Sequence, residues 1–174
     1  MKIVLLSGGC GVGKKTVGES LSQKVGFPLI HNHMTTNIAR ALHKRDSEEF
    51  RVLLFELRKT IIISSLNSGL SGLVMTHASH QFIGNDYFNW LKFLCEENNI
   101  TLKVVNLLCT ESERSRRFLS KERELHGKPC ESQIFNKIQQ EWGPPMIIKY
   151  DNCFSVNVEE LSPDQVAETI FYQL

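Results

Sequence analysis

The sequence predicts an α/β fold in which a mostly parallel sheet carries helices on both faces. Five short apolar runs, typical of buried strands, alternate with segments whose apolar residues recur at helical spacing. The first run ends in a glycine-rich turn that leads directly into a helical pattern. Because alternating strands and helices form parallel sheets with right-handed crossovers, we expect ligands to bind beyond the C-terminal ends of the strands.

The first half of the chain is expected to hold three strands and the helices between them. A strand over 2–6 precedes a helix, and a Gly-Phe-Pro break separates that helix from a second strand over 29–31. A helical or irregular stretch over 35–44 follows. Ser47 then caps a helix with one apolar stripe, and a third strand covers 73–77. The stripe consists of Phe50, Leu54, Leu57 and Ile61.

The second half is expected to add two strands and three or more helices. A helix begins at Asn85 or Asp86, a fourth strand covers 100–108, and Thr110 with Glu113 forms a capping box for the next helix. The remaining elements are a helix marked by Ile134, Ile138 and Trp142, a fifth strand over 153–156, and a last helix with Ser162 at its cap and Pro163 at its first position.

Length and composition favour one domain and exclude several classes. With 174 residues, of which 41% are hydrophobic, the chain suffices for one well-buried α/β domain over 1–174. A net charge of +1 gives no indication of a nucleic-acid partner. No apolar stretch reaches membrane-span length, Met1 leads straight into the first strand, and five scattered cysteines indicate free thiols. We therefore expect a cytoplasmic protein, monomeric or weakly dimeric.

The glycine-rich turn after the first strand has the spacing of a phosphate-binding loop. Gly8, four residues, Gly13 and Lys14 fit the Walker A pattern between a strand and a helix. The glycines let backbone N–H groups close around a phosphate, and the helix N-terminus points at the same anion. Lys14 would neutralise the β- and γ-phosphates and take part in catalysis. The predicted nucleotide-binding residues of the loop are Gly8, Gly9, Cys10, Gly11, Val12, Gly13, Lys14, Lys15 and Thr16.

One position of the loop departs from the usual pattern. The residue after the loop lysine is ordinarily Ser or Thr, whose hydroxyl binds Mg²⁺, whereas this chain has Lys15 followed by Thr16. We expect ATP and Mg²⁺ as cofactors, with the metal held through water and ATP oxygens and with no protein metal ligand. The Lys15 charge either stands in partly for Mg²⁺ or points to solvent, and Thr16 is expected to bond an α-phosphate oxygen.

Other classes of phosphate-loop protein lack their motifs here. Asn136-Lys137 lies inside a predicted helix and does not continue as the Asn-Lys-x-Asp of a GTPase, and the signature of transporter ATPases is absent. The compact chain resembles the small P-loop kinases: shikimate, gluconate and adenylate kinases and antibiotic phosphotransferases. It is most similar to shikimate-kinase-like ATP-binding proteins of unsettled substrate, whose pattern resembles Gly13–Gly18 followed by His31–Met34.

That resemblance implies a three-layer P-loop fold with a five-stranded parallel sheet in the order 2-3-1-4-5. It also implies that residues 110–130 form a lid over the phosphates and that Asn157 and Val158 contact adenine. Within the lid we expect Arg117 first and Arg123 second to act on the transferred phosphoryl group, and Arg114 to stack on adenine. A solvated helix with local ion pairs is the alternative interpretation of these charges.

The acceptor region departs from shikimate kinase. The Asp that holds the acceptor hydroxyl there is replaced by His31, Asn32 and His33, so shikimate itself is not expected. We predict that His31, His33 and Arg58 bind the acceptor, since imidazole titrates near neutral pH and guanidinium forks onto carboxylate or phosphate. The resulting hypothesis is an ATP-dependent kinase for an unidentified small molecule. The alternative is a nucleotide-binding protein or slow ATPase without kinase turnover.

Overall fold

The computed structural model describes residues 1–45, 47–81, 86–120 and 130–174. Its centre is a parallel five-stranded sheet in the order β2-β3-β1-β4-β5. In chain order the strands are β1 (Lys2–Gly8), β2 (Leu29–Ile30), β3 (Gly72–Ala78), β4 (Thr101–Leu108) and β5 (Cys153–Asn157). The predicted fold class and strand order are therefore confirmed.

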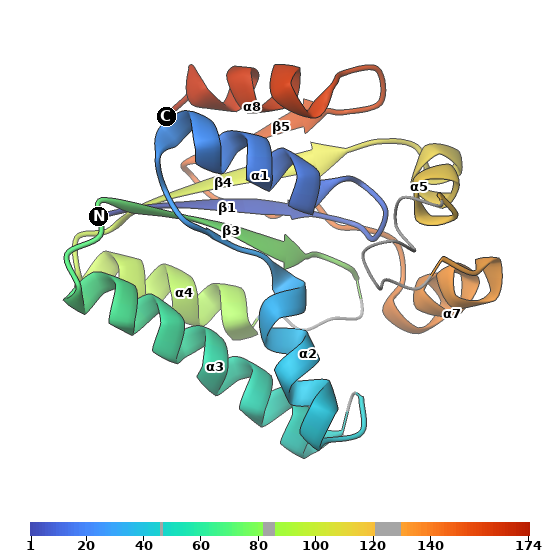
Figure 1. Cartoon of the computed structure of the whole chain (residues 1–174), viewed down its shortest axis with the longest axis horizontal. Coiled ribbons are helices and arrows are strands. Elements are labelled where there is room, and N and C mark those ends of the chain that lie inside the picture. The colour runs from blue at the N-terminus through green and yellow to red at the C-terminus, as the bar shows by residue number, and fades with distance from the viewer. Residues whose placement is uncertain (46, 82–85, 121–129) are drawn as a thin grey trace.

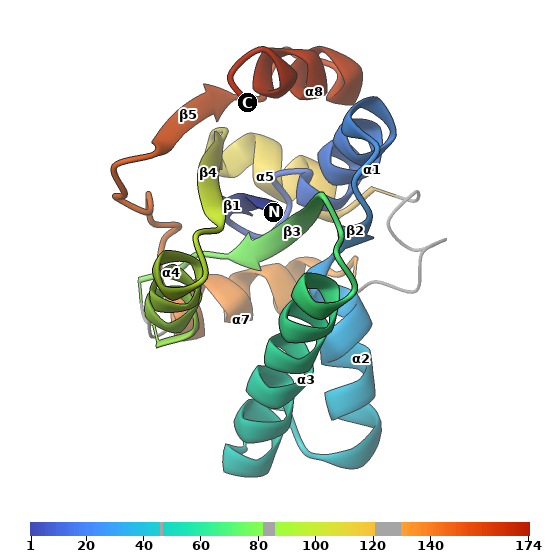
Figure 2. The same cartoon turned by 90° about the vertical axis from the view of Figure 1, so that its left-hand side faces the viewer.

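Helices cover both faces of the sheet, and two more lie beyond the C-terminal ends of its strands. The helices are α1 (Lys14–Val25), α2 (Asn32–Leu42), α3 (Glu48–Asn67), α4 (Asp86–Glu97), α5 (Glu111–Phe118), α7 (Ser132–Trp142) and α8 (Pro163–Phe171). Figure 1 shows α1 and α8 on one face, α3 and α4 on the other, and α5 and α7 past the arrowheads of the strands. Figure 2 shows the resulting three layers nearly end-on.

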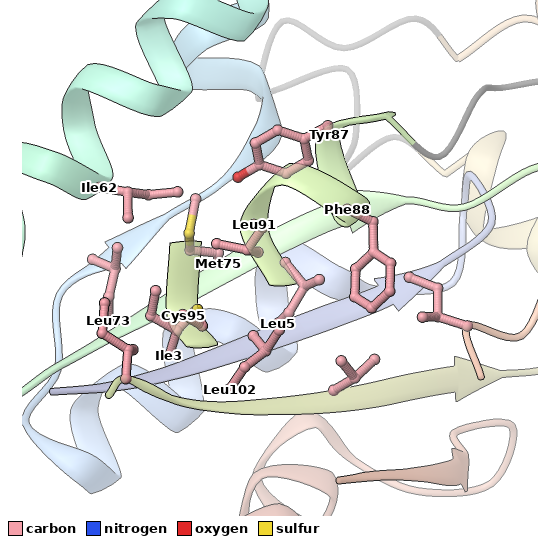
Figure 3. Close-up of a cluster of buried hydrophobic side chains, with 13 residues drawn as sticks. Ile3, Leu5, Ile62, Leu73, Met75, Tyr87, Phe88, Leu91, Cys95 and Leu102 are labelled. Carbon is pink, nitrogen blue, oxygen red and sulfur yellow. The ribbon is translucent and has the colours of Figure 1, made fainter. Parts of the chain in front are cut away.

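The alternation of side chains along β1 gives the sheet two apolar cores. Ile3 and Leu5 enter the cluster that includes Leu91 of α4 and Ile62 of α3 (Figure 3). Val4 and Leu6, which point to the opposite face, pack in the cluster of α1 and α8. Each fully buried side chain of this kind stabilises the fold by about 1.5–3 kcal/mol relative to exposure. The two cores fix β1 centrally, and with it the loop that follows.

The second strand is shorter than the sequence predicts, and this places the next helix earlier. The β2 ladder ends at Ile30, and His31 becomes the N-cap of α2 with extended backbone angles. The Asn32 N–H donates to Thr76 Oγ1 of β3 at 2.8 Å instead of continuing the ladder. Residues 32–34, which were outside the predicted helical stretch, are therefore helical, and His33 lies on the first turn of α2.

Two of the three predicted helix caps form as expected, and the third forms one of the two hydrogen bonds of a capping box. Ser47 accepts from the Phe50 N–H, and Ser162 forms a full capping box with Pro163 at the first position. Thr110 Oγ1 accepts from the Glu113 N–H at 3.3 Å. The Glu113 carboxylate bonds the two arginines of the next turn rather than reaching back to Thr110, because charge-assisted bonds are stronger.

Some predictions fall outside the described residues. Asn85 is one of them, so the structure describes α4 from Asp86 onward. Residues 121–129 of the predicted lid, Arg123 among them, lie outside as well. Within the described ranges, no helix combines the length and apolar character needed to cross a membrane.

Candidate functional site

The phosphate loop connects β1 to α1 and encloses the ammonium of Lys14. The Lys14 Nζ donates to the carbonyl oxygens of Gly8 and Gly9 at 2.7 and 2.8 Å. The N-cap of α1 is Gly13, which has a φ of 100° and, as a glycine, no side chain to cover the first helical turn. The exposed N–H groups of that turn and the ammonium therefore face the same small volume, which is the arrangement that binds phosphate.

Close packing explains why the middle of the loop is glycine. Gly11 has a φ of 86°, and a Cβ at this position would overlap the backbone carbonyl oxygen of Arg114 on α5. Gly9 lies against the Pro145 ring, which leaves no room for a side chain there either. The loop is thus pressed against the segments that follow β4 and α7, and those segments set its shape.

His80, which the sequence analysis did not single out, anchors the tip of the loop. The Cys10 N–H donates to His80 Nε2 at 3.3 Å, and His80 Nδ1 lies 2.8 Å from the Gly143 carbonyl oxygen. Because Nε2 accepts, the proton must be on Nδ1, where it bonds Gly143. Burial, with the nearby charges of Lys14 and Arg114, lowers the pKa of His80 and keeps it neutral. No sequence motif marks His80. The one available signal is its position just after the third strand, at the edge of the sheet where ligands bind.

Arg117 connects the loop to the segment after β5. Its guanidinium donates to the carbonyl oxygens of Val12, Val158 and Glu159 at 3.2, 2.8 and 3.1 Å. Its Nε lies 2.5 Å from Glu113 Oε1, and the two arginines on Glu113 lower the pKa of that carboxyl to about 2. Arg117 therefore lies beside the phosphate loop, where its guanidinium is engaged with backbone carbonyl groups and a carboxylate.

Arg114 occupies a different environment from the one expected. It is 4% exposed, its guanidinium lies over the Phe135 ring, and it donates to Gln139 Oε1 at 3.3 Å. It does not line the cavity described below, so its predicted stacking on adenine finds no support in this geometry. Its backbone, which contacts Gly11, shapes the loop instead.

A cavity of about 670 Å³ opens beside the phosphate loop and extends to the second strand. Residues 10–17 line one side, and His31, Asn32 and His33 line another. Val158, predicted beside adenine, lies on its wall, whereas Asn157 does not. The sequence-predicted phosphate and acceptor residues thus share one space, apart from Gly8, Gly9, Arg58, Arg114 and Asn157, which do not line it. Arg123 lies outside the described residues.

The cavity wall carries mostly positive charge. Among the described lining residues the only carboxylate is Glu19, whose Oε1 lies 3.1 Å from Lys15 Nζ. The cations on the wall are Lys14, Lys15, Arg40, Arg45, Arg116 and Arg117. Coulomb attraction at such close range favours an anionic ligand.

The acceptor end is held in place by a polar network behind its wall. Arg58 donates to Asn32 Oδ1 and, at 3.5 Å, to Thr35 Oγ1, and it lies 5.0 Å from the centre of the Tyr87 ring. It does not line the cavity, so it supports Asn32 rather than facing the space directly. The rings of His31 and His33 lie 6.2 Å apart. Arg58 is half-buried, and the loss of solvent around its guanidinium lowers its pKa.

His77 and Tyr87 form a second buried polar group behind the cavity. Their rings stack at 5.7 Å, and burial lowers the pKa of His77 to about 3, with Arg58 and Lys14 adding to the shift. Burial also raises the pKa of Tyr87 to about 12, and its hydroxyl has no hydrogen-bond partner among the described residues. Both groups are therefore neutral at physiological pH.

The described residues do not assemble a side-chain metal site. Within the described ranges, no three or more His, Cys, Asp or Glu side chains gather closely enough to hold a metal ion. His31 and His33 are neighbours without a third such ligand.

Comparison with known proteins connects the chain to one fold. No family model and no curated protein matches the sequence significantly. Solved structures do match over nearly the whole chain. A sugar kinase from a Janibacter species is 14% identical, with a TM-score of 0.67 over 99% of this chain and 92% of its own. The APS kinase of Mycobacterium tuberculosis, in complex with AMPPNP and APS, is 15% identical, with a TM-score of 0.67 over 99% and 96%.

Shikimate kinase from Aquifex aeolicus is 20% identical, with a TM-score of 0.59 over 99% of this chain and 95% of its own. At these identities the likeness shows the fold, and residue roles do not transfer with it. A sugar kinase, an APS kinase and a shikimate kinase thus share the fold of this chain.

Proposed function

We propose that this chain, which has the fold of the P-loop small-molecule kinases, binds ATP and transfers its γ-phosphoryl group to a small molecule. The observation that carries the proposal is the Lys14 ammonium, held inside a glycine loop at one end of a cavity that also reaches His31 and His33. A nucleotide and a second molecule can therefore occupy one continuous space.

Phosphoryl transfer depends on positioning and charge neutralisation, and the loop supplies both. Lys14 would exchange its bonds to Gly8 and Gly9 for the β- and γ-phosphates, while loop N–H groups surround the β-phosphate. Thr16 would bond the α-phosphate. Val158 would contact the base, because its side chain lies on the cavity wall. The Arg117 guanidinium holds the Val158 carbonyl oxygen and so fixes this residue in place.

Arg117 is proposed as the cation on the transferred phosphoryl group. Its guanidinium already lies beside the phosphate loop, bonded to Val12. To act on the phosphoryl group it would have to release at least one backbone carbonyl, a cost that closure over ATP can offset. Loss of Arg117 would then lower kcat more than the affinity for ATP.

The acceptor is proposed to lie beyond the γ-phosphate, against the start of α2. His33 would hold its hydroxyl or accept its proton, since neutral imidazole can do either. Arg58 would position Asn32 from behind the wall. Arg40 and Arg45, which line the same cavity, favour an acceptor with a carboxylate, phosphate or sulfate group.

A screen of acceptors tests the proposal. The purified chain would be incubated with γ-labelled ATP, with and without Mg²⁺, and with nucleosides, sugars, shikimate-like acids and antibiotics. We expect one chemical class to become labelled by the wild type and not by Lys14→Ala. Binding of ATP without any labelled acceptor would contradict kinase activity.

The alternative is a nucleotide-binding protein or a slow ATPase. It is favoured by the residues His31, Asn32 and His33, which provide no carboxylate at the end of β2 where shikimate kinase has its Asp. In that case ATP would bind, and ADP would form slowly with inorganic phosphate as the only phosphoryl product.

A further inference from the structure

The P-loop fold implies Mg²⁺ beside the phosphates, and the described residues at the positions that usually hold this ion do not fit it. Mg²⁺ takes oxygen ligands in near-octahedral geometry and in P-loop proteins is held by the hydroxyl after the loop lysine and by an Asp. Here an ammonium occupies the hydroxyl position, at Lys15, and an ammonium has no lone pair to donate.

The carboxylate partner is missing from the described wall as well. The ends of β2 and β3 contribute Asn32, Thr76 and Ala78 to the cavity. Asn32 Oδ1 already accepts from Arg58. The remaining acid on the described wall is Glu19, and its carboxylate is paired with Lys15.

Charge at the start of α1 points the same way. The first turn contains Lys14 and Lys15 and no acidic residue, although the positive end of a helix dipole favours acids and disfavours cations. Gly13 provides no side-chain cap. A polyanion at this turn would meet the helix dipole and both ammonium charges, and Lys15 adds a second full charge where the fold ordinarily relies on a metal.

The Lys15 side chain is held close to the cavity. Its side chain is 22% exposed, compared with 47% for Glu19, and both residues line the cavity. Exposed ion pairs four residues apart on a helix contribute only a few tenths of a kcal/mol to stability. The main effect of the ion pair between Lys15 and Glu19 is therefore to hold the Lys15 ammonium beside the cavity, and its effect on helix stability is small.

We propose that Lys15 replaces Mg²⁺ in nucleotide binding, so that the chain takes the nucleoside triphosphate as the metal-free anion, with Glu19 positioning the ammonium. This inference rests on the proposed function, because it concerns the same phosphate site. It predicts that this chain binds metal-free ATP at least as tightly as MgATP, whereas a P-loop with a hydroxyl ligand would bind MgATP more tightly.

Calorimetric titration of ATP into the full chain, in EDTA and in excess Mg²⁺, tests the inference. We expect the wild type to bind ATP in EDTA at least as tightly as MgATP. Lys15→Ser removes the charge and restores a hydroxyl, so its affinity should fall about tenfold or more in EDTA and recover with Mg²⁺. Lys24→Ser, a change of the same kind further along α1 and outside the cavity, should behave as wild type.

Glu19→Gln separates this account from one in which Glu19 is the metal ligand. If Lys15 replaces the metal, binding in EDTA is retained, because the Gln amide oxygen can still accept from the Lys15 ammonium and hold it in place. A selective loss of MgATP binding in Glu19→Gln would overturn the inference. So would wild-type affinity that is tenfold or more tighter with Mg²⁺. An absence of binding in both buffers would overturn the proposed function itself, and the inference with it.

Discussion

The two ends of the cavity are built in different ways. At the phosphate end the ligand would meet backbone N–H groups, held in place by Lys14, His80 and Arg117 from three different elements. At the acceptor end it would meet side chains from the start of α2 and the turn after it. A rigid backbone cradle can recognise any triphosphate, whereas exposed side chains determine which acceptor fits.

The largest effect should come from removing the cation of the phosphate end. Lys14→Ala deletes the ammonium that lies inside the loop, so we expect ATP affinity to fall about 100-fold or more, since charge-assisted bonds to phosphate are the strong ones. Calorimetry measures this. Lys59→Ala, which alters a half-exposed ion pair on α3, serves as the control. If Lys14→Ala bound ATP as tightly as the wild type, the phosphate end would not be the part of the cavity that recognises the triphosphate.

A smaller change in the same loop tests its close packing. Gly11→Ala and Gly26→Ala both place a side chain at a positive φ, but only at position 11 does the Cβ meet the Arg114 backbone. We expect Gly26→Ala to cost about 1 kcal/mol of unfolding free energy and to bind ATP normally. Gly11→Ala should cost about 3 kcal/mol and weaken ATP binding. Denaturant titration and calorimetry compare them; equal costs would show that the loop is not tightly packed.

The wall behind the acceptor end should respond to pH instead. His77 has a folded pKa of about 3 against about 6.5 unfolded, with Arg58, Lys14 and His80 as its charged or titratable neighbours. Below pH 6.5 the unfolded chain binds the extra proton, so stability is complete above that pH and falls as pH drops towards 3. At pH 5 the loss is about 2 kcal/mol.

Unfolding titrations of wild type and His77→Leu, at pH 7.5 and pH 5, measure this contribution. The variant should lack about 2 kcal/mol of the acid-induced loss. If the unfolding free energies of the two proteins changed equally with pH, the pKa of His77 would not be lowered in the folded state.

The smallest effect is expected at the loop tip. His80→Phe keeps a ring beside Trp142 but can neither accept from the Cys10 N–H nor donate to the Gly143 carbonyl oxygen. The bond to Cys10, which is the one that holds the loop, contributes about 1 kcal/mol, so ATP affinity should fall about fivefold. An unchanged affinity would show that the loop keeps its shape without this bond.

The sequence predicted the phosphate end better than the acceptor end, and the reason is physical. Gly8, Gly13 and Lys14 lie close together in the chain, so their spacing alone specifies the turn and the cation. The fold class followed from strands that alternate with helices, because that order leaves few topologies. These are local signals, and the structure confirms the fold that they imply.

The remaining features depend on contacts between distant segments. His80 reaches Cys10 across 70 positions, and no pattern in the sequence marks that pair. Arg58 shares a helix flank with apolar residues, but its direction toward Asn32 was set by where α2 begins. Arg114 was predicted to stack on adenine. A run of charged residues in the sequence does not show which of its side chains is buried, and here it is Arg114. The predicted roles of Arg117, His31 and His33 stay predictions.

The most direct measurement is a crystal structure of the chain with a non-hydrolysable ATP analogue. We expect the triphosphate to lie in the loop over residues 8–16. Lys14 Nζ would leave the carbonyl oxygens of Gly8 and Gly9 for the β- and γ-phosphates, and the γ-phosphate would point towards His33. An analogue bound elsewhere, with Lys14 still on those two carbonyl groups, would contradict the assignment of this cavity as a nucleotide site.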